Sequence, residues 1–348
     1  MALILYYHKI HKTPREGLWY KSFDLQLRLL KSRFKVVPPG EICSALAERR
    51  PMAKNWVAIT FDDGYADNLV YAYPLLKKHG LKAALFPAFS RLRASDDIRP
   101  TLEDYWAGKV SFGELHTPLT MSRANLEHFE KGSSADFLTF SELKKISDVF
   151  EIGGHASEHA RVFAGGKIND FCDGKNVKWT HYRAFGEKPG PGWPLVSMKS
   201  SIAAARGTLK PAARDFVRSL DGAFFRRKGW KPRLKAELEA KFGEVFTFES
   251  EAGKEKRVAE EIASSKAGLE AALGRRIRYF SYPFGEYDAH LSRVVAENFS
   301  AAVTTRKKSI TAETDPYLIP RASVSDDIFT FTGVLLKYRL GRLGLATK

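Results

Sequence analysis

The sequence is poor in cysteine, in long apolar runs and in repeated or low-complexity segments. Only Cys43 and Cys172 are present, with no CxxC spacing, so neither a thiolate metal site nor a disulfide framework is expected, and we predict two free thiols. No apolar run reaches the roughly 18 residues of a membrane-spanning helix, and the first residues, MALILYYHKIHK, lack the pattern of a secretory signal. These absences predict a soluble, cytoplasmic chain, unless a leader has been removed.

Acidic residues are also few in relation to basic ones, with 40 Asp and Glu against 56 Lys and Arg and a net charge of +16. A charge of this size favours encounters with anionic partners such as nucleic acids, acidic glycans and anionic lipid surfaces. No recognised nucleic-acid-binding motif is present, so no specific nucleic-acid partner is expected. With 44% hydrophobic and 28% charged residues, the 348-residue chain can bury a large core.

Short apolar runs alternate with longer helical patterns, which is typical of a parallel sheet with crossover helices. The helical patterns cover residues 22–33, 67–79 and a segment from Lys254 to Gly274, where Val258, Ile262, Leu269 and Leu273 follow helical spacing. The predicted strands are Leu3–Tyr7, Val57–Phe61, Ala83–Phe86, Phe150–Ile152, Ile277–Tyr282 and Ala301–Thr304. The sequence therefore predicts an α/β fold.

The stretch ITFDDG places Asp62 and Asp63 directly after a predicted strand. The carboxyl ends of the strands form the catalytic face of parallel α/β barrels. Adjacent side chains of an extended chain point in opposite directions, so the two carboxylates can serve different tasks, and Gly64 permits a tight turn after them. Taken alone, Asp-Asp-Gly is also ordinary turn chemistry.

Two further stretches follow predicted strands. FEIGGHASEHA contains His155 and His159, four residues apart, and two histidines with one carboxylate are a common ligand set for a divalent metal. FSYPFGEYD contains a Pro-Phe-Gly turn that could expose a peptide N–H group toward a reacting carbonyl. Taken alone, the histidine pair is also compatible with a surface feature, and the turn with an ordinary loop.

In this order, TFDDGYADN, HASEH and FSYPFGEYD resemble the successive motifs of the NodB-like polysaccharide deacetylases, carbohydrate esterase family four. The similarity covers residues 1–160 and 252–327. It implies a distorted (β/α) TIM-like barrel that binds one divalent metal, usually zinc, and removes N-acetyl groups from amino sugars. By motif position, Asp63, His155 and His159 would be the metal ligands, Asp62 the general base, and the backbone N–H of Phe284 an oxyanion donor.

The resemblance departs from the family pattern at three positions. No Leu-x-His occurs in the last fifty residues, and ILYYHKI instead places His8 after the first strand, as in a rearranged subgroup in which an N-terminal YH supplies the acid. The arginine that would orient the base is replaced by Ser281, and Arg321 is a candidate substitute because arginine can hold a carboxylate in bidentate geometry. Ala156 stands where Ser or Thr is usual.

The predicted domains are 1–161, the first part of the deacetylase barrel; 162–251, a basic insertion; and 252–348, the second part of the barrel with a C-terminal tail. The insertion is expected to be mostly helical or loop, with helices at 199–207, 211–219 and 231–241. It is either a lid or substrate platform, with Trp179, Tyr182 and Trp193 for stacking on sugars, or a solvated decoration. The tail is either a barrel-closing helix, a frayed end or a peripheral membrane contact.

The sequence thus predicts metal-dependent hydrolysis, most simply with Zn²⁺, of the N-acetyl amide of an amino sugar in a glycan. The motifs leave open whether the glycan is a polysaccharide or a lipid-linked saccharide, and whether it is anionic. Two alternatives also remain open: a deformylase or deacylase of a lipid-linked amino sugar, and a catalytically inactive barrel that binds polyanions.

Overall fold

The structure, a computed structural model, describes residues 2–339. Its contacts divide the chain into two units. The first comprises Met1–Glu158, Glu261–Gly285 and Ser292–Lys348, and the second comprises His159–Glu260 and Glu286–Leu291.

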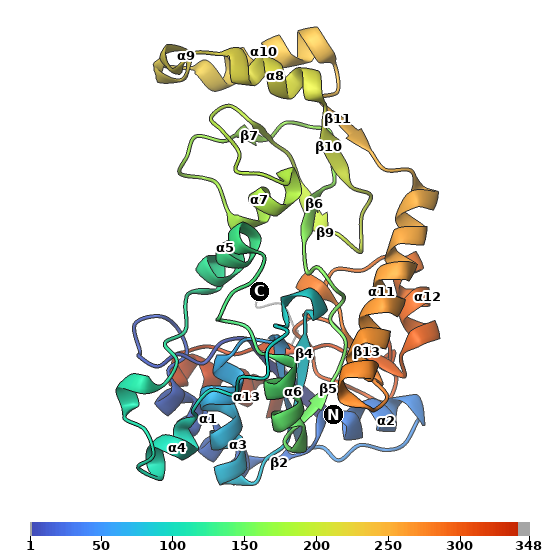
Figure 1. Ribbon diagram of the computed structural model, residues 1–348. Coiled ribbons are helices and arrows are strands. Elements are labelled where there is room, and N and C mark those ends of the chain that lie inside the picture. Colours follow the sequence, from blue (N-terminus) through green and yellow to red (C-terminus); the bar gives the residue numbers. More distant parts are fainter. Residues whose placement is uncertain (1, 340–348) are drawn as a thin grey trace. The chain divides into compact units, whose positions relative to one another are not determined.

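The first unit is built on parallel strands (Figure 1). They are β1 (Ala2–Tyr7), β2 (Lys35–Val36), β3 (Trp56–Asp63), β4 (Ala83–Pro87), β5 (Phe150–Ile152), β12 (Tyr279–Ser281), β13 (Ala301–Val303) and β14 (Ala322–Ser323). The main sheet has the order β14-β1-β3-β4-β5, with β2 also paired to β3, while β12 pairs with β13. A single parallel bridge from Gly154 to Phe280 links the two sheets, and another joins Val303 of β13 to Ile319 in the segment before β14. The ring of strands is a distorted (β/α) barrel, as predicted.

Helices pack around these strands. They are α1 (Tyr20–Arg33), α2 (Pro39–Ala47), η1 (Asn68–Ala72), α3 (Tyr73–His79), η2 (Phe89–Arg91), α4 (Leu102–Trp106), η3 (Phe112–Glu114), α5 (Met121–Lys131), α6 (Phe140–Lys145), η4 (Ile146–Asp148), α11 (Glu251–Leu273), η5 (Pro283–Gly285), α12 (Ala289–Asn298) and α13 (Ile328–Arg339). Helix α1 contacts α3 and α13, and α2 contacts β3, β4 and β13. Because helices cover the strands, β1 and β3 are buried along nearly their whole length, which explains their continuous apolar sequences.

The predicted strands of the barrel are all observed, with ends that differ by a few residues. The helices predicted at 22–33 and from Lys254 to Gly274 are α1 and α11. The helix predicted at 67–79 is observed in two parts, because η1 is a π-helical turn that precedes α3. A π turn leaves no clear signature in hydrophobic periodicity, so the sequence could not predict it.

The second unit has a core of its own. Its strands are β6 (Arg161–Phe163), β7 (Asp170–Phe171), β8 (Pro194–Leu195), β9 (Met198–Ser200), β10 (Gly207–Leu209) and β11 (Phe246–Phe248), and its helices, apart from its parts of α11 and α12, are α7 (Trp179–Phe185), α8 (Pro211–Ser219), α9 (Gly222–Arg226) and α10 (Trp230–Phe242). An antiparallel sheet has the order β11-β10-β6-β9. The helices predicted at 211–219 and 231–241 are confirmed as α8 and α10.

The prediction of a helix at 199–207 is wrong. Its Ala-rich sequence favours a helix locally, but Ser200 pairs with Arg161 in β9 and Gly207 pairs with Phe163 and Phe248 in β10. Pairing with distant strands overrides the local propensity. Trp193 was expected to stack on sugar, but it is 2% exposed and packs in the core of this unit, so that expectation is also wrong.

The predicted free thiols are confirmed, since Cys43 and Cys172 are buried and form no disulfide. Of the alternatives left open for the C-terminal tail, the described part agrees with a helix that packs on the barrel: it is α13, which buries Phe331, Leu335 and Tyr338. The rest of the predicted tail, including Arg342, lies outside the described residues. Within residues 2–339 we find no helix with the length and apolar character needed to cross a membrane.

Candidate active site

The paired carboxylates lie at the carboxyl end of β3. Asp62 and Asp63 pair in register with Phe86 and Pro87 of β4, and they are only 3% and 2% exposed. The chain turns sharply after them, since Asp63 has φ of 72° and Gly64 has φ of 80°, and the Gly64 N–H donates to the Asp62 carbonyl at 3.0 Å. Glycine tolerates this conformation, whereas an aspartate at positive φ is strained. The turn aims the two carboxylates at different partners.

Asp62 is held by Arg321, which is fully buried. The guanidinium donates from Nη1 to Asp62 Oδ1 at 2.8 Å and from Nη2 to Asp62 Oδ2 at 2.7 Å, which is a bidentate pair. Its other donors reach Thr60 Oγ1 at 3.0 Å, Ser281 Oγ at 2.8 Å and the Thr304 carbonyl at 3.0 Å. All five N–H groups of Arg321 are therefore used, and Asp62 has a fixed orientation.

The charge state of Asp62 follows from the same contacts. Burial alone would raise the pKa of its carboxyl, but the paired guanidinium of Arg321 lowers the pKa by more than burial raises it, so the net pKa lies below the usual range. Asp62 is therefore an ionised carboxylate at neutral pH, which is the form that can accept a proton.

Asp63 faces two histidines. The ligand atoms of Asp63, His155 and His159 lie within 4.8 Å of one another, and all three side chains are buried. His155 Nε2 is 3.4 Å from Asp63 Oδ1. Zinc bonds of about 2.0–2.2 Å in a tetrahedron place neighbouring ligand atoms about 3.3 Å apart. The spacing and the two-histidine, one-carboxylate donor set both fit a divalent cation such as Zn²⁺.

The tautomer of His155 is fixed by its other nitrogen. His155 Nδ1 lies 2.7 Å from the backbone carbonyl of Ser281. A carbonyl can only accept, so Nδ1 carries a hydrogen, and in the neutral form of the ring the lone pair lies on Nε2, which faces Asp63. A metal-binding histidine is commonly oriented in this way. Ser281 thus supports the site twice, through its carbonyl on His155 and its hydroxyl on Arg321.

The loop that carries the histidines is held by a carboxylate that the sequence analysis missed. Glu261 of α11 accepts hydrogen bonds through Oε1 from the backbone N–H groups of Ser157 and Glu158, at 3.2 and 3.0 Å. The Ala156 carbonyl accepts from the N–H of Phe89 at 3.2 Å. Ala156 is buried and has a φ of 58°. Because its side chain is a methyl group, it provides no hydroxyl beside the histidines.

Backbone strain is concentrated at these motifs. Within residues 2–339, the non-glycine residues with positive φ are Arg49, Asp63, Ala156, His159 and Phe284. All except Arg49 lie in the three motifs. Such conformations cost about 1–3 kcal/mol each and persist where the surrounding structure enforces them, often at functional sites.

His8 follows β1, which lies between β14 and β3 in the sheet. The last residue of β1, Tyr7, pairs with Phe61, so His8 leaves the sheet at the same edge as Asp62 and lowers the pKa of Asp62. His8 is partly exposed and helps to line a cavity of about 380 Å³, together with Tyr6, His11 and Ser323. A partly exposed imidazole beside a cavity is accessible to a ligand.

Phe284 lies in the turn after β12, with φ of 60°. The Gly285 N–H donates to the Tyr282 carbonyl at 2.8 Å and closes the turn. Gly285 itself has φ of 68° and no room for a side chain, since an added Cβ would lie 1.9 Å from Thr305 Oγ1 and 2.9 Å from the Thr305 backbone N. Only glycine fits this position of the Pro-Phe-Gly turn.

We expect Gly285→Ala to destabilise the protein by about 1–3 kcal/mol, because it adds strain at positive φ and a collision with the side chain and the backbone nitrogen of Thr305. Gly80→Ala is the matched control, since Gly80 has φ of 65° and no atom within 4 Å of an added Cβ. Urea unfolding of the two variants measures the difference. Equal losses would show that the close approach at Gly285 has no energetic effect.

The structure brings together Asp63, His155 and His159, and separately joins Asp62 to Arg321. It places His8 and Phe284 at strand ends of the same barrel, and the roles of all these residues stay predictions. Three other polar residues near the motifs were missed: Glu261, Asp136 and Asn68. Asn68 is the last residue of the stretch TFDDGYADN and could have been noticed there, whereas Glu261 and Asp136 come from segments with no distinguishing pattern.

Known proteins resemble this chain in sequence and in fold. Residues 49–164 match the family model described as polysaccharide deacetylase. The protein YxkH of Bacillus subtilis (strain 168), which is named as a polysaccharide deacetylase, is 37% identical over 84 residues. That match covers 24% of this chain and 30% of YxkH, so the chain spans less than a third of the length of this relative.

Solved structures share the fold over nearly the whole chain. IcaB from Ammonifex degensii superposes with a TM-score of 0.55 at 18% identity, covering 97% of each chain. The deacetylase PplD of Streptococcus pyogenes, solved in complex with acetate, gives 0.53 at 18% identity with the same coverage. A de-N-acetylase from Aggregatibacter actinomycetemcomitans gives 0.56 at 14% identity, covering 96% of this chain and 99% of that one.

Proposed function

We propose that this chain, whose residues 49–164 match the model of the polysaccharide deacetylase family, hydrolyses the N-acetyl amide of an amino sugar in a glycan and releases acetate. The observation that carries the proposal is the pair of adjacent carboxylates with separate partners. Asp62 is clamped by Arg321, and Asp63 lies with His155 and His159 in a set that fits a divalent metal. Amide hydrolysis at neutral pH requires both a base and an electrophile.

The metal would be held by Asp63, His155 and His159, and Zn²⁺ suits this donor set. When bound, a divalent cation supplies Lewis acidity, which polarises the acyl oxygen and lowers the pKa of a nearby water. Asp62 would accept the proton of the attacking water, with Arg321 fixing the orientation of the carboxylate. The backbone N–H of Phe284 would donate to the negative charge that develops on the acyl oxygen.

The departing nitrogen must take up a proton before it can leave as an amine. Histidine is suited to this task because its pKa lies close to neutrality, and His8 is the candidate at this edge of the barrel. The cavity beside His8 offers room for part of a sugar. We assign His8 as the general acid, in line with the rearranged order of motifs.

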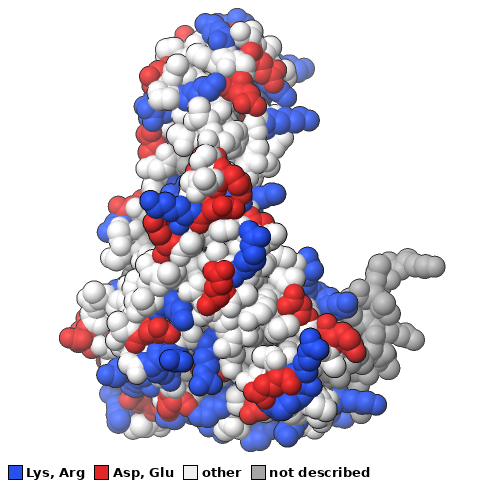
Figure 2. All heavy atoms as spheres, turned by 90° about the vertical axis from the view of Figure 1, so that its right-hand side faces the viewer, with Lys and Arg blue, Asp and Glu red and all other residues white. Residues whose placement is uncertain are grey.

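The substrate remains an N-acetylated glycan, with polysaccharide and lipid-linked forms both compatible with the site. The face shown in Figure 2 carries acidic and basic side chains interspersed, so the net charge of +16 is not gathered there into one basic surface. This face therefore gives no support to a polyanion-binding barrel without activity. A formyl amide would bind beside the same catalytic groups, so deformylation has to be measured together with deacetylation.

The test is acetate release from N-acetylglucosamine oligomers by the purified protein, with and without EDTA. We expect EDTA to abolish the activity and Zn²⁺ to restore it, because the water and the acyl oxygen would lose their activating cation. N-formylated oligomers measured in parallel separate deacetylation from deformylation. Activity that persists after complete metal removal, or salt-sensitive polyanion binding without hydrolysis, would contradict the proposal.

A further inference from the structure

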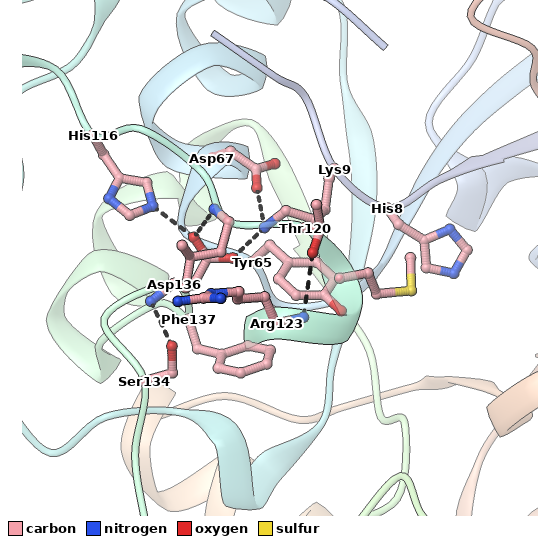
Figure 3. Close-up of polar contacts among 12 residues, drawn as sticks. His8, Lys9, Tyr65, Asp67, His116, Thr120, Arg123, Ser134, Asp136 and Phe137 are labelled. Carbon is pink, nitrogen blue, oxygen red and sulfur yellow. Dashed lines mark hydrogen bonds and ion pairs between the residues drawn. The ribbon is translucent and has the colours of Figure 1, made fainter. Parts of the chain in front are cut away.

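A buried charge cluster surrounds Lys9, the residue that follows His8 (Figure 3). Lys9 Nζ contacts Asp67 Oδ2 at 3.0 Å and also pairs with Asp136, and the three side chains are at most 4% exposed. The ammonium lies 4.0 Å from the centre of the Tyr65 ring, and His116 Nε2 is 2.9 Å from Asp136 Oδ1. Removing one partner of a buried ion pair strongly destabilises a protein. The ammonium of Lys9 is therefore held in place by its two carboxylate partners.

The backbone on either side of Lys9 is held by two consecutive residues. Asn68 Nδ2 donates to the His8 carbonyl at 2.9 Å, and Asp67 Oδ1 accepts from the Ile10 N–H at 2.8 Å. Asn68 Nδ2 also donates to Asp67 Oδ1 at 3.1 Å, which joins the two contacts. The backbone of His8 through Ile10 is therefore anchored on both sides, and its lysine is anchored as well.

The side chain of His8 is directed away from this cluster. Neighbouring side chains of an extended segment point to opposite sides, and Figure 3 shows His8 turned away from Lys9. Within residues 2–339 no hydrogen bond from the imidazole itself is recorded, while its ring lies 5.6 Å from that of Tyr6. The position of the ring is therefore set mainly through the backbone that carries it.

The anchoring residues belong to the same segment as the catalytic carboxylates. Asp67 and Asn68 come four and five residues after Asp63, and Asn68 opens the π-helical turn η1. A π turn widens the helix by one residue and is frequent at functional sites. One short segment of chain thus carries Asp62 and Asp63 at its start and the contacts to His8 at its end.

We propose that Asn68, together with the ion cluster of Lys9, Asp67 and Asp136, is a positioning device that fixes His8 relative to Asp62. The inference rests on the proposed function, in which His8 is the general acid. A general acid acts only within hydrogen-bond reach of the leaving atom, and a displacement of about 1 Å can lower a rate about 100-fold. Asn68 touches no reacting atom and acts through His8.

The chemistry provides a readout that a merely structural role would not change. In amide hydrolysis the hydroxyl of water ends on the acetate carbon and its proton passes to Asp62. The C–N bond breaks with its electron pair on nitrogen, and that nitrogen takes a proton from the His8 imidazolium. A 4-nitrophenolate leaving group departs as a stable anion and needs no proton, so loss of the acid should affect the amide far more than this ester.

The experiment compares kcat of Asn68→Ala on N-acetylglucosamine oligomers and on 4-nitrophenyl acetate. We expect the amide-to-ester ratio of kcat to fall at least about tenfold with KM for the oligomer little changed, since positioning and not binding is lost. His8→Ala removes the acid altogether and so shows the largest fall in this ratio that loss of the acid can cause. Asn298→Ala is the control, because its side-chain amide also donates to a backbone carbonyl, that of Val294 at 2.9 Å, and its ratio should equal that of the unaltered protein.

The possible results separate the two proposals. If His8→Ala lowers the ratio and Asn68→Ala does not, the positioning role is overturned and the role of His8 stands. If neither variant lowers it, His8 is not the acid and both fail. Should Asn68→Ala not fold, Asn68→Asp carries the test, since it keeps the shape of the side chain but removes the amide that donates to the His8 carbonyl. An unchanged ratio in the folded Asn68→Asp protein would overturn the proposal.

Discussion

Asp62→Asn should lower the rate of deacetylation by about 10²–10⁴-fold while the protein still takes up its metal. An amide in place of the carboxylate cannot accept the proton of the attacking water at neutral pH. Metal uptake should persist because Asp63, His155 and His159 form the ligand set without Asp62. Acetate release and metal content, measured on the same preparation, test both halves of the prediction.

Glu142→Gln is the matched control for the loss of a buried, arginine-paired carboxylate. Glu142 is fully buried and contacts Arg99 through both oxygens, at 2.9 and 3.0 Å, but it lies in α6 and not at the motifs. This variant should lose stability and keep its activity at temperatures where it is folded. Equal losses of activity in the two variants would mean that Asp62 acts through stability and not as a base.

Arg321→Met should destabilise the protein by about 3–5 kcal/mol, because it leaves the buried carboxylate of Asp62 without its counter-charge. The loss is expected to be large since all five donors of Arg321 are used and the side chain is fully buried. Urea unfolding in the presence of EDTA measures this effect without compensation from a cation. Arg321→Met should also lose activity, because Asp62 loses its fixed orientation. Arg321→Lys should not restore that activity, because an ammonium cannot reproduce the bidentate pair.

A double-mutant cycle shows whether Arg321 acts through Asp62. The double variant Asp62→Asn, Arg321→Met should be more stable than the sum of the single losses predicts, by about 1–3 kcal/mol, because its carboxylate is no longer charged. Strict additivity would contradict the account, since it would mean that the contacts of Arg321 with Thr60, Ser281 and Thr304 carry the whole effect.

The sequence predicted the barrel well because its strands are buried on both faces and read as continuous apolar runs. Residues 57–61 and 83–86 are examples, and both are observed at nearly the predicted bounds. The predicted metal ligands lie at the ends of such strands or in the loop that follows one. In a parallel barrel those ends lie at one edge, so side chains far apart in sequence were expected to meet.

The rest depends on contacts between distant segments. Nothing in the sequence around Glu261 distinguishes it from other acidic residues of a long helix, yet it holds the loop of His155 and His159. Asp136 similarly reaches Lys9 across 127 positions of the chain. The strands near 199–207 form because partners in β6 and β11 are available, which local helix propensity cannot reveal.

The central claim is that Asp63, His155 and His159 hold one divalent cation beside Asp62. The most direct test is a crystal structure of the zinc-loaded protein with anomalous diffraction recorded on both sides of the zinc absorption edge. The account predicts one anomalous peak per chain, about 2.0–2.2 Å from a carboxylate oxygen of Asp63 and from a ring nitrogen of each histidine. A fully active protein whose crystals show no peak there, or a peak bound by other residues, would contradict it.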